Sequence, residues 1–178
     1  MFTQNAVAGN VFLNDISVLR QNAQKLMQAA PPAPDGATAI ALLQSVLSAE
    51  IVCVLRYTMI SVSQDGLKNP AIGAEFQEQA NDERRHMMMA AARIEQLGGT
   101  PDFSPRVSAE AAIPPDADFP RRVRENLAAE QSVIAHYHDL IGFFADKDPH
   151  TSAMLGEIMR DEEDHTSDME DLLASYAS

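Results

Sequence analysis

Cysteine and long apolar runs are both scarce in this sequence. It contains one cysteine, Cys53, so an intramolecular disulfide is impossible and a secreted, disulfide-stapled scaffold is excluded. Its apolar runs, such as residues 51–55, are far too short to cross a bilayer, and the N-terminus lacks a basic region followed by an apolar run. We therefore expect a soluble cytoplasmic protein with no membrane partner.

Basic side chains are also few. The chain has 13 Lys and Arg residues against 26 Asp and Glu residues, which gives a formal net charge of −13 and a pI near 4.6. Nucleic-acid binding through a general basic surface is not expected, because phosphate contacts need clustered Lys and Arg. Attraction of cations is the natural consequence of this charge balance.

Strand-like alternation of apolar and polar residues is absent, and helix-forming residues dominate the periodic segments. At 178 residues the chain is long enough for one domain with a substantial core. Proline and glycine separate four long segments, so we expect an all-α fold with helices over residues 37–65, 70–97, 120–144 and 149–175.

The connection between the second and third expected helices, residues 100–119, holds four prolines and is long for a compact domain. A connection of this length allows the two helices that it joins to lie parallel. We therefore expect a four-helix bundle over residues 37–178 with a long crossover between its second and third helices. Residues 1–36 are expected to form an N-terminal arm with a short helix near 15–30, in contact with neighbouring subunits.

Two Glu-x-x-His motifs lie in these helices, Glu83 with His86 and Glu162 with His165. Residues three apart project from one face of a helix, so each pair could grip one side of a metal ion. A lone glutamate on the helix before completes each copy: Glu50 in the first and Glu130 in the second. The chain therefore reads as one helix pair repeated with an offset of about 80 residues.

Each of the four glutamates falls on the apolar seam of its helix. In the third helix, for example, Glu130 shares a seam with Ile134, Tyr137 and Ile141. An unpaired ionised carboxylate in a core costs several kcal/mol even after relaxation, and four together would repel one another. Two divalent cations would cancel the four charges, and the two histidines would add neutral nitrogen ligands.

The donor types indicate the class of metal. Oxygen-rich ligation with one imidazole per ion favours iron or manganese over zinc, whose usual sites use sulfur and nitrogen. One Glu from each of two helices and Glu-x-x-His from each of the other two is the pattern of di-iron and di-manganese carboxylate bundles. A lone Glu-x-x-His usually belongs to a solvated face, but six such residues repeated in order on apolar seams indicate a dinuclear site.

Longer stretches around these residues carry a family resemblance: 50–57, 82–86, 93–103, 127–130, 146–149 and 162–165. With them the chain resembles the ferritin superfamily from about residue 38 to 175, and within it the bacterioferritins and the Dps-like mini-ferritins. The resemblance implies that Glu83 and Glu162 bridge two metals. It also implies that Glu50 with His86 and Glu130 with His165 cap them, and that Tyr57 stands beside the site.

The resemblance further implies a ferroxidase and iron-storage protein. Its six ligands would bind two iron ions per subunit, with manganese or zinc as possible substitutes, oxidise Fe(II) with O2 or H2O2, and deposit Fe(III) mineral inside a hollow shell. The same ligands also allow a manganese catalase or another di-iron oxidase. A shell that protects DNA is a third interpretation, against which the acidic charge and the lack of a basic tail count.

Two departures from the family pattern affect what is carried over. Bacterioferritins ligate haem through a methionine directly after the second-helix glutamate, and Arg84 occupies that position here, so haem is not expected. Only 13 residues follow His165, which leaves no room for the short fifth helix of 24-subunit shells. A 12-subunit homo-oligomeric shell is therefore expected over a 24-subunit one.

The remaining candidates have simpler interpretations. Cys53 is expected to be a small buried hydrophobe, and Tyr137 a core residue. For Tyr57, seven residues after Glu50, an electron-donating or ligand-orienting role is a hypothesis. His136 is expected to be structural or solvent-facing. The acidic run over residues 161–171 is expected to be a solvated face, and in a shell some of its residues would face the cavity and nucleate mineral.

Overall fold

The computed structural model describes residues 11–31, 35–104 and 118–176, and every regular element in this part of the chain is a helix. The helices are α1 (Val11–Ala29), α2 (Gly36–Ser61), α3 (Gln64–Lys68), α4 (Pro70–Gln96), α5 (Phe119–Phe144) and α6 (Pro149–Tyr176). The prediction of an all-α fold is confirmed.

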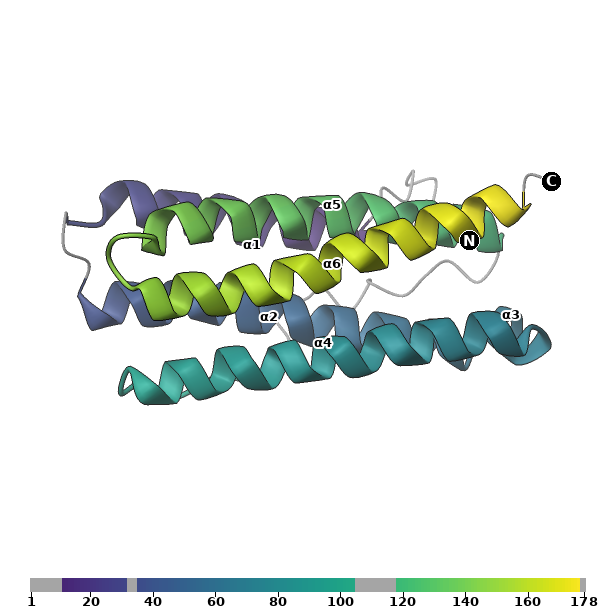
Figure 1. Cartoon of the computed structure of the whole chain (residues 1–178), viewed down its shortest axis with the longest axis horizontal. Helices are drawn as coiled ribbons and strands as arrows, with labels where there is room; N and C mark the ends of the chain where they lie inside the picture. The colour runs from purple at the N-terminus through teal and green to yellow at the C-terminus, as the bar shows by residue number, and fades with distance from the viewer. Residues whose placement is uncertain (1–10, 32–34, 105–117, 177–178) are drawn as a thin grey trace, which may run out of the picture.

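Helices α2, α4, α5 and α6 form the bundle (Figure 1). Helix α2 packs mainly on α4, and α5 mainly on α6. Helix α5 starts at the end of the bundle opposite to the end of α4, so these two helices run parallel, as the long connection predicted. The two helix pairs of the sequence repeat thus face each other across one core.

Side-chain caps explain where the long helices begin. The Asp35 carboxylate accepts a hydrogen bond from the backbone N–H of Thr38 at 2.9 Å, and Asp118 accepts one from Arg121 at 2.8 Å. Helix α4 begins with proline directly after the Asn69 cap and ends before Gly98, whose φ of 82° suits a residue without a side chain. Local chemistry therefore sets most helix boundaries.

The first bundle helix ends earlier than the sequence predicted. Helix α2 stops at Ser61, and the separate short helix α3 follows, capped by Ser63. A Cβ at Gly66 would clash with the carbonyl oxygens of Ser61 and Ile60, so only glycine allows the chain to fold back this tightly. The expected continuous helix to residue 65 is wrong because of this corner.

Alternate positions of the predicted seam of α5 lie one residue from the buried face, whereas Glu130 and Tyr137 are fully buried as predicted. Val133 and Leu140 are 1% and 0% exposed, whereas Ile134 and Ile141 are only half-buried. Val133 and Leu140 keep the three- and four-residue spacing with Glu130 and Tyr137, so the inward stripe passes on their side. Apolar residues also occupy 134 and 141, so the spacing alone could not choose between the two stripes.

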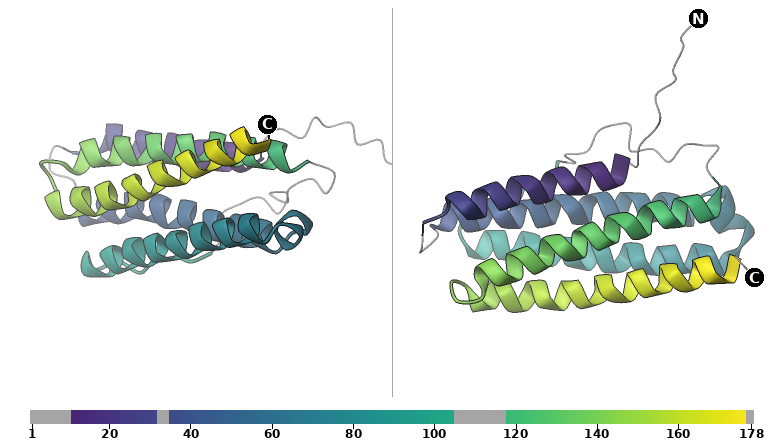
Figure 2. Two further views of the ribbon diagram at one scale, coloured as in Figure 1. Left: turned by 45° about the vertical axis from the view of Figure 1, so that its right-hand side comes forward. Right: turned by 90° about the horizontal axis from the view of Figure 1, so that it is seen from above.

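Helix α1 lies along α2 and α5 (Figure 2). Ile16 and Ala23 are buried, and Asp139 on α5 accepts hydrogen bonds at 2.9 Å from both Arg20 and Gln24. The N-terminal segment therefore packs on its own subunit through α1. Its expected contact with neighbouring subunits stays a prediction.

Helix α2 is the one helix among the described residues that is long and apolar enough to cross a membrane. Of its most apolar window, 61% is buried inside the bundle, as in the core helix of a soluble protein. Burial in the bundle therefore explains its composition.

Candidate metal centre

The six predicted ligands come from all four bundle helices and meet in the core. Each is at most 4% exposed: Glu50 on α2, Glu83 and His86 on α4, Glu130 on α5, and Glu162 and His165 on α6. Helix periodicity explains the pairs on α4 and α6, because residues three apart share a face. Each histidine Nδ1 lies close to the glutamate of its own pair, at 3.3 Å in α4 and 3.2 Å in α6.

Two carboxylates lie between the two imidazoles. Glu83 Oε2 is 3.3 Å from His86 Nδ1, and its Oε1 is 3.2 Å from His165 Nδ1. Glu162 repeats this arrangement, with Oε1 3.2 Å from His86 Nδ1 and Oε2 3.2 Å from His165 Nδ1. The rings themselves are 6.4 Å apart between centroids. Each of these carboxylates thus offers one oxygen to each side of the centre.

The other two glutamates have different surroundings. Glu50 Oε2 is 3.7 Å from His86 Nδ1, and Glu50 Oε1 accepts a hydrogen bond from the Tyr137 hydroxyl. Glu130 is fully buried, and neither of its carboxylate oxygens has a hydrogen-bond partner among the described residues. One oxygen of Glu130 lies within 4.8 Å of ligand atoms of Glu83 and Cys53.

Burial and mutual repulsion oppose ionisation of these carboxyl groups. Burial, followed by the charge of Glu50, raises the pKa of Glu83. Burial and the neighbouring Glu162 raise the pKa of Glu130 well above its ordinary value. Burial alone would lower the pKa of His165, but its hydrogen bonds to Glu162 and Glu83 outweigh that effect and raise it to about 12. Positive charge at the centre is therefore strongly favoured.

Two aspartates outside the six ligands contact the histidine rings at Nε2, the ring nitrogen that faces away from the centre. Asp161 Oδ2 is 2.9 Å from His86 Nε2 and also accepts a 2.6 Å hydrogen bond from Arg85. Asp82 Oδ2 is 3.6 Å from His165 Nε2. A carboxylate at Nε2 orients the ring so that Nδ1 faces the centre. Sequence reasoning placed Asp161 on a solvated face, although each aspartate directly precedes a ligand glutamate.

The two tyrosines of the repeat have different surroundings. Tyr137, expected to be only a core residue, donates to Glu50 across the bundle. Its signal in the sequence was its spacing of seven residues from Glu130. Tyr57 is fully buried against Phe76, and within the described residues its hydroxyl has no hydrogen-bond partner. The catalytic role suggested for Tyr57 stays a prediction.

Cys53 lies one helical turn beyond Glu50 and is 1% exposed. Burial and then the negative charge of Glu130 raise the pKa of its thiol well above the ordinary value. The expected character of a small buried hydrophobe fits this environment.

The residues present fit a pair of divalent cations. The buried, unpartnered oxygens of Glu130 are hard donors, and the facing oxygens of Glu83 and Glu162 are placed for two neighbouring ions. Burying these carboxylates without a nearby positive charge would cost several kcal/mol. Two bound cations would supply that charge. Four of the six, Glu50, Glu83, His86 and Glu162, offer ligand atoms that all lie within 4.8 Å of one another.

Comparison with known proteins agrees with this fold. The family model described as the ferritin-like domain matches residues 40–177, and the chain belongs to this family. Among curated proteins, it is 27% identical over 143 residues to the DNA protection during starvation protein of Pyrococcus furiosus, covering 77% of each chain.

Solved structures of bacterioferritin-type proteins are also similar. One is a dodecameric thioferritin, the bacterioferritin-related protein of Bacteroides fragilis, with a TM-score of 0.72, 25% identity, and coverage of 89% of this chain and 95% of that one. Another is the bacterioferritin BfrA of Mycobacterium tuberculosis, with a TM-score of 0.67, 25% identity, and coverage of 76% and 83%. The ferritin-like bundle and the resemblance to bacterioferritin and Dps proteins are therefore confirmed.

Proposed function

We propose that this protein is a ferroxidase that binds two Fe(II) ions at the buried centre and oxidises them for storage as Fe(III) mineral. The observation that carries the proposal is the pair of carboxylates, Glu83 and Glu162, each with one oxygen toward each histidine. In this assignment they bridge the two ions, while Glu50 with His86 and Glu130 with His165 bind one ion each.

Iron is the substrate of this reaction. Each Fe(II) loses one electron, and H2O2 accepts both together with two protons to give two water molecules; O2 accepting two electrons would instead give H2O2. The protein holds the two ions close together, excludes bulk water and replaces the lost hydration with carboxylate oxygens. Manganese or zinc could occupy the same donors.

We also propose a homo-oligomeric cytoplasmic shell that encloses the mineral. The dodecameric state of the similar Bacteroides fragilis protein supports 12 subunits over 24. Measurement of the particle mass by light scattering tests this: about twelve times the 19.4 kDa chain is expected. A monomer would contradict the storage function.

The oxidation reaction is tested by mixing the protein and Fe(II) with O2 or H2O2 and following the absorbance change as Fe(II) becomes Fe(III). Replacing Glu83 and His86 together by alanine should remove the rapid phase, with a fall of roughly 100-fold or more because ions are no longer held at one side of the centre. The matched control is Glu170→Ala with His150→Ala, which removes the same residue types from exposed positions of α6. Equal rates in both variants would refute a ferroxidase centre.

Protection of DNA is a second candidate, because the curated relative is named a DNA protection during starvation protein. The net charge of −13 opposes attraction to phosphates. A gel-shift experiment at low salt decides: retention of DNA by the assembled shell would establish this function beside iron storage. A manganese catalase or other di-iron oxidase would share the ligands but would not accumulate mineral.

A further inference from the structure

Helix α2 carries a Glu-x-x-Cys pair, Glu50 and Cys53, at the spacing that α4 and α6 use for Glu-x-x-His. Residues three apart share one face of a helix, so Cys53 follows Glu50 toward the centre. The equivalent residue on α5, 80 positions later, is Val133, and both residues are 1% exposed. The copy that includes α2 thus has a possible sulfur ligand where the other copy has an apolar side chain.

The sulfur of Cys53 lies among ligand atoms of the metal centre. Cys53 Sγ and one carboxylate oxygen from each of Glu83 and Glu130 all lie within 4.8 Å of one another. Atoms that bind one ion at about 2.0–2.3 Å lie within roughly 4.6 Å of one another, so a group of this size can hold an ion. The position of the sulfur therefore suits a ligand as well as a buried hydrophobe.

Glu130 provides a second observation that points to an ion at this place. Its side chain is 0% exposed, and neither carboxylate oxygen has a hydrogen-bond partner among the described residues. A buried carboxylate without a partner is costly, and a thiol that only fills space beside it does not remove that cost. An ion bound by Glu130 and the neighbouring sulfur would.

The sulfur belongs to one of the two ion positions. Two groups of potential metal ligands occur among the described residues, and Glu83 belongs to both. One group has oxygen and nitrogen donors and includes His86, whereas the other joins Glu83 to Cys53 and Glu130. Cys53 therefore lies at the position assigned above to Glu130 with His165, which we call the second ion position.

We propose that the Cys53 sulfur is a ligand of the second ion position and makes the two positions of the centre chemically unequal. A thiolate favours softer ions such as Co(II) and Zn(II) over Mn(II), whereas carboxylate oxygens suit Mn(II). As the metal–sulfur bond forms, the thiol proton leaves the sulfur. The inference rests on the proposed dinuclear centre and adds a residue that sets the ion preference at one side of it.

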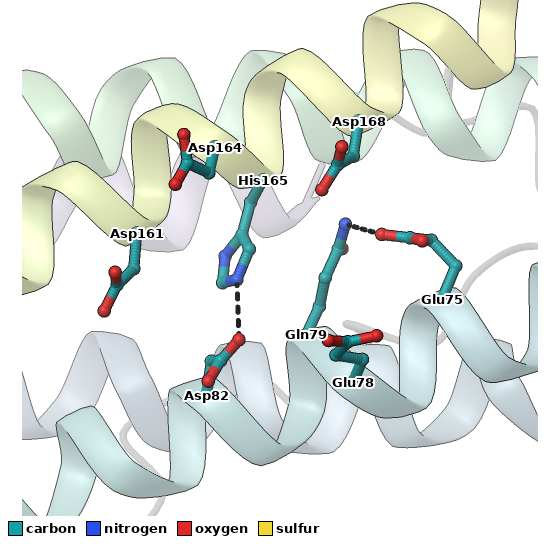
Figure 3. Close-up of a pocket in the computed structure, with 8 residues that line it drawn as sticks. All are labelled: Glu75, Glu78, Gln79, Asp82, Asp161, Asp164, His165 and Asp168. Carbon is teal, nitrogen blue, oxygen red and sulfur yellow. Dashed lines mark hydrogen bonds and ion pairs between the residues drawn. The ribbon is translucent and has the colours of Figure 1, made fainter.

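The Cys53 thiol is shielded from the surface pocket that reaches this ion position. His165 lines that pocket, of about 240 Å³, between α4 and α6, and its ring points toward Asp82 (Figure 3). Cys53 comes from α2, and the described lining of the pocket does not include it. A metal–sulfur signal would therefore report an ion inside the centre.

The test is the absorption spectrum of the metal-free, assembled protein during titration with Co(II). Native protein should bind two Co(II) per subunit and develop an intense near-ultraviolet band from sulfur-to-cobalt charge transfer. The chain contains one cysteine, so no other thiolate can produce this band. Cys53→Ser should lose the band and reduce the preference of the second position for Co(II) over Mn(II) by at least about tenfold.

The matched control is Val133→Thr, which places a hydroxyl at the equivalent buried position of α5, as Cys53→Ser does on α2. It should keep both the band and the preference for Co(II). Cys53→Ala adds no hydroxyl and should behave like Cys53→Ser, and circular dichroism should show native helix content in each variant. An equal loss of Co(II) preference in Cys53→Ser and Val133→Thr would indicate a packing effect and overturn the inference.

Fe(II) oxidation by the same proteins separates this inference from the ferroxidase proposal. Two bound Co(II) without the charge-transfer band, in a protein that oxidises Fe(II) rapidly, would refute the sulfur ligand and leave the proposed function standing. The band in a protein that does not oxidise Fe(II) would leave the sulfur ligand standing while the proposed function fails. A native protein that binds no Co(II) would overturn both.

Discussion

Equivalent positions in the two copies of the helix pair hold different residue types and make different interactions. Arg56 and His136 are 80 residues apart, as are Ser45 and Glu125, and this is the offset that relates the ligands. In one place Arg56 Nη2 on α2 lies 3.7 Å from Glu125 Oε2 on α5. In the other, His136 Nε2 on α5 lies 3.0 Å from Ser45 Oγ on α2. An ion pair thus stands where the other copy has a neutral hydrogen bond.

Burial accounts for this difference. It lowers the pKa of Arg56 to about 10, which leaves the guanidinium charged at neutral pH and in need of Glu125. It lowers the pKa of His136 to about 4, so that ring is neutral, and helix α1 lies beside it with Arg20 acting on the same ring. In both copies the same positions therefore face the partner helix. The surrounding residues decide whether a charged or a neutral interaction forms there.

The largest expected effect comes from removing Arg56, which forms the ion pair with Glu125. Arg56→Met should lower the free energy of unfolding by about 2–4 kcal/mol, because the buried Asn126 loses its hydrogen-bond donor and Glu125 keeps Arg121 but loses Arg56. Urea denaturation of the metal-free protein measures this. Arg124→Met, at an exposed position of α5, is the control and should change stability by less than about 0.5 kcal/mol. Similar losses in both variants would show that the ion pair contributes nothing specific.

The buried, neutral His136 should make the free energy of unfolding depend on pH. The pKa of His136 is about 4 in the folded protein against 6.5 for an ordinary histidine, so the unfolded chain binds the proton first as the pH falls. Stability is then lost between about pH 6.5 and pH 4, by up to about 3 kcal/mol. Asp139 opposes this lowering of the pKa and Arg20 adds to it.

His136→Gln isolates this contribution from the other groups that titrate in acid. The stability of the native protein relative to this variant, measured by urea denaturation at several pH values, should decrease as the pH falls through that window. Parallel curves for the two proteins would contradict a neutral, buried His136.

The aspartates behind the two histidines offer a matched pair of substitutions. Asp161→Asn should weaken binding of Co(II) at the buried centre by about 10–100-fold, because the 2.9 Å contact that orients His86 is lost. Asp82→Asn should have a smaller effect, since its contact with His165 is longer, at 3.6 Å. Calorimetric titration measures both. A larger effect for Asp82→Asn would reverse the proposed asymmetry between the two ion positions.

The smallest expected difference is between the two tyrosines. Tyr137→Phe should lower stability by about 1 kcal/mol and slow Fe(II) oxidation, because Glu50 loses its hydrogen-bond donor. Tyr57→Phe should leave stability nearly unchanged, since the Tyr57 hydroxyl has no described partner. Unchanged oxidation kinetics in Tyr57→Phe would also remove the electron-donating role suggested for that residue.

Much of this architecture could be predicted from the sequence. Caps such as Asp35 and Asp118, together with the prolines and glycines, mark the helix boundaries, because each acts within a few residues of itself. The candidate ligands were found because carboxylates on apolar seams require compensation. The end of α2 was missed, because the corner at Gly66 depends on contacts with Ser61 and Ile60 that helix propensity does not include.

By itself, the sequence determined the four bundle helices, the long crossover and which residue types lie on their inward faces, since periodicity and capping are local properties. Only the tertiary structure decided which helix each polar group meets. That Tyr137 bonds Glu50 rather than a group of its own copy, and that Asp161 supports His86 from another helix, depends on how the helices are placed around the core. The physical reason is distance: helix periodicity relates residues within a few turns, whereas these contacts join residues 87 and 75 positions apart.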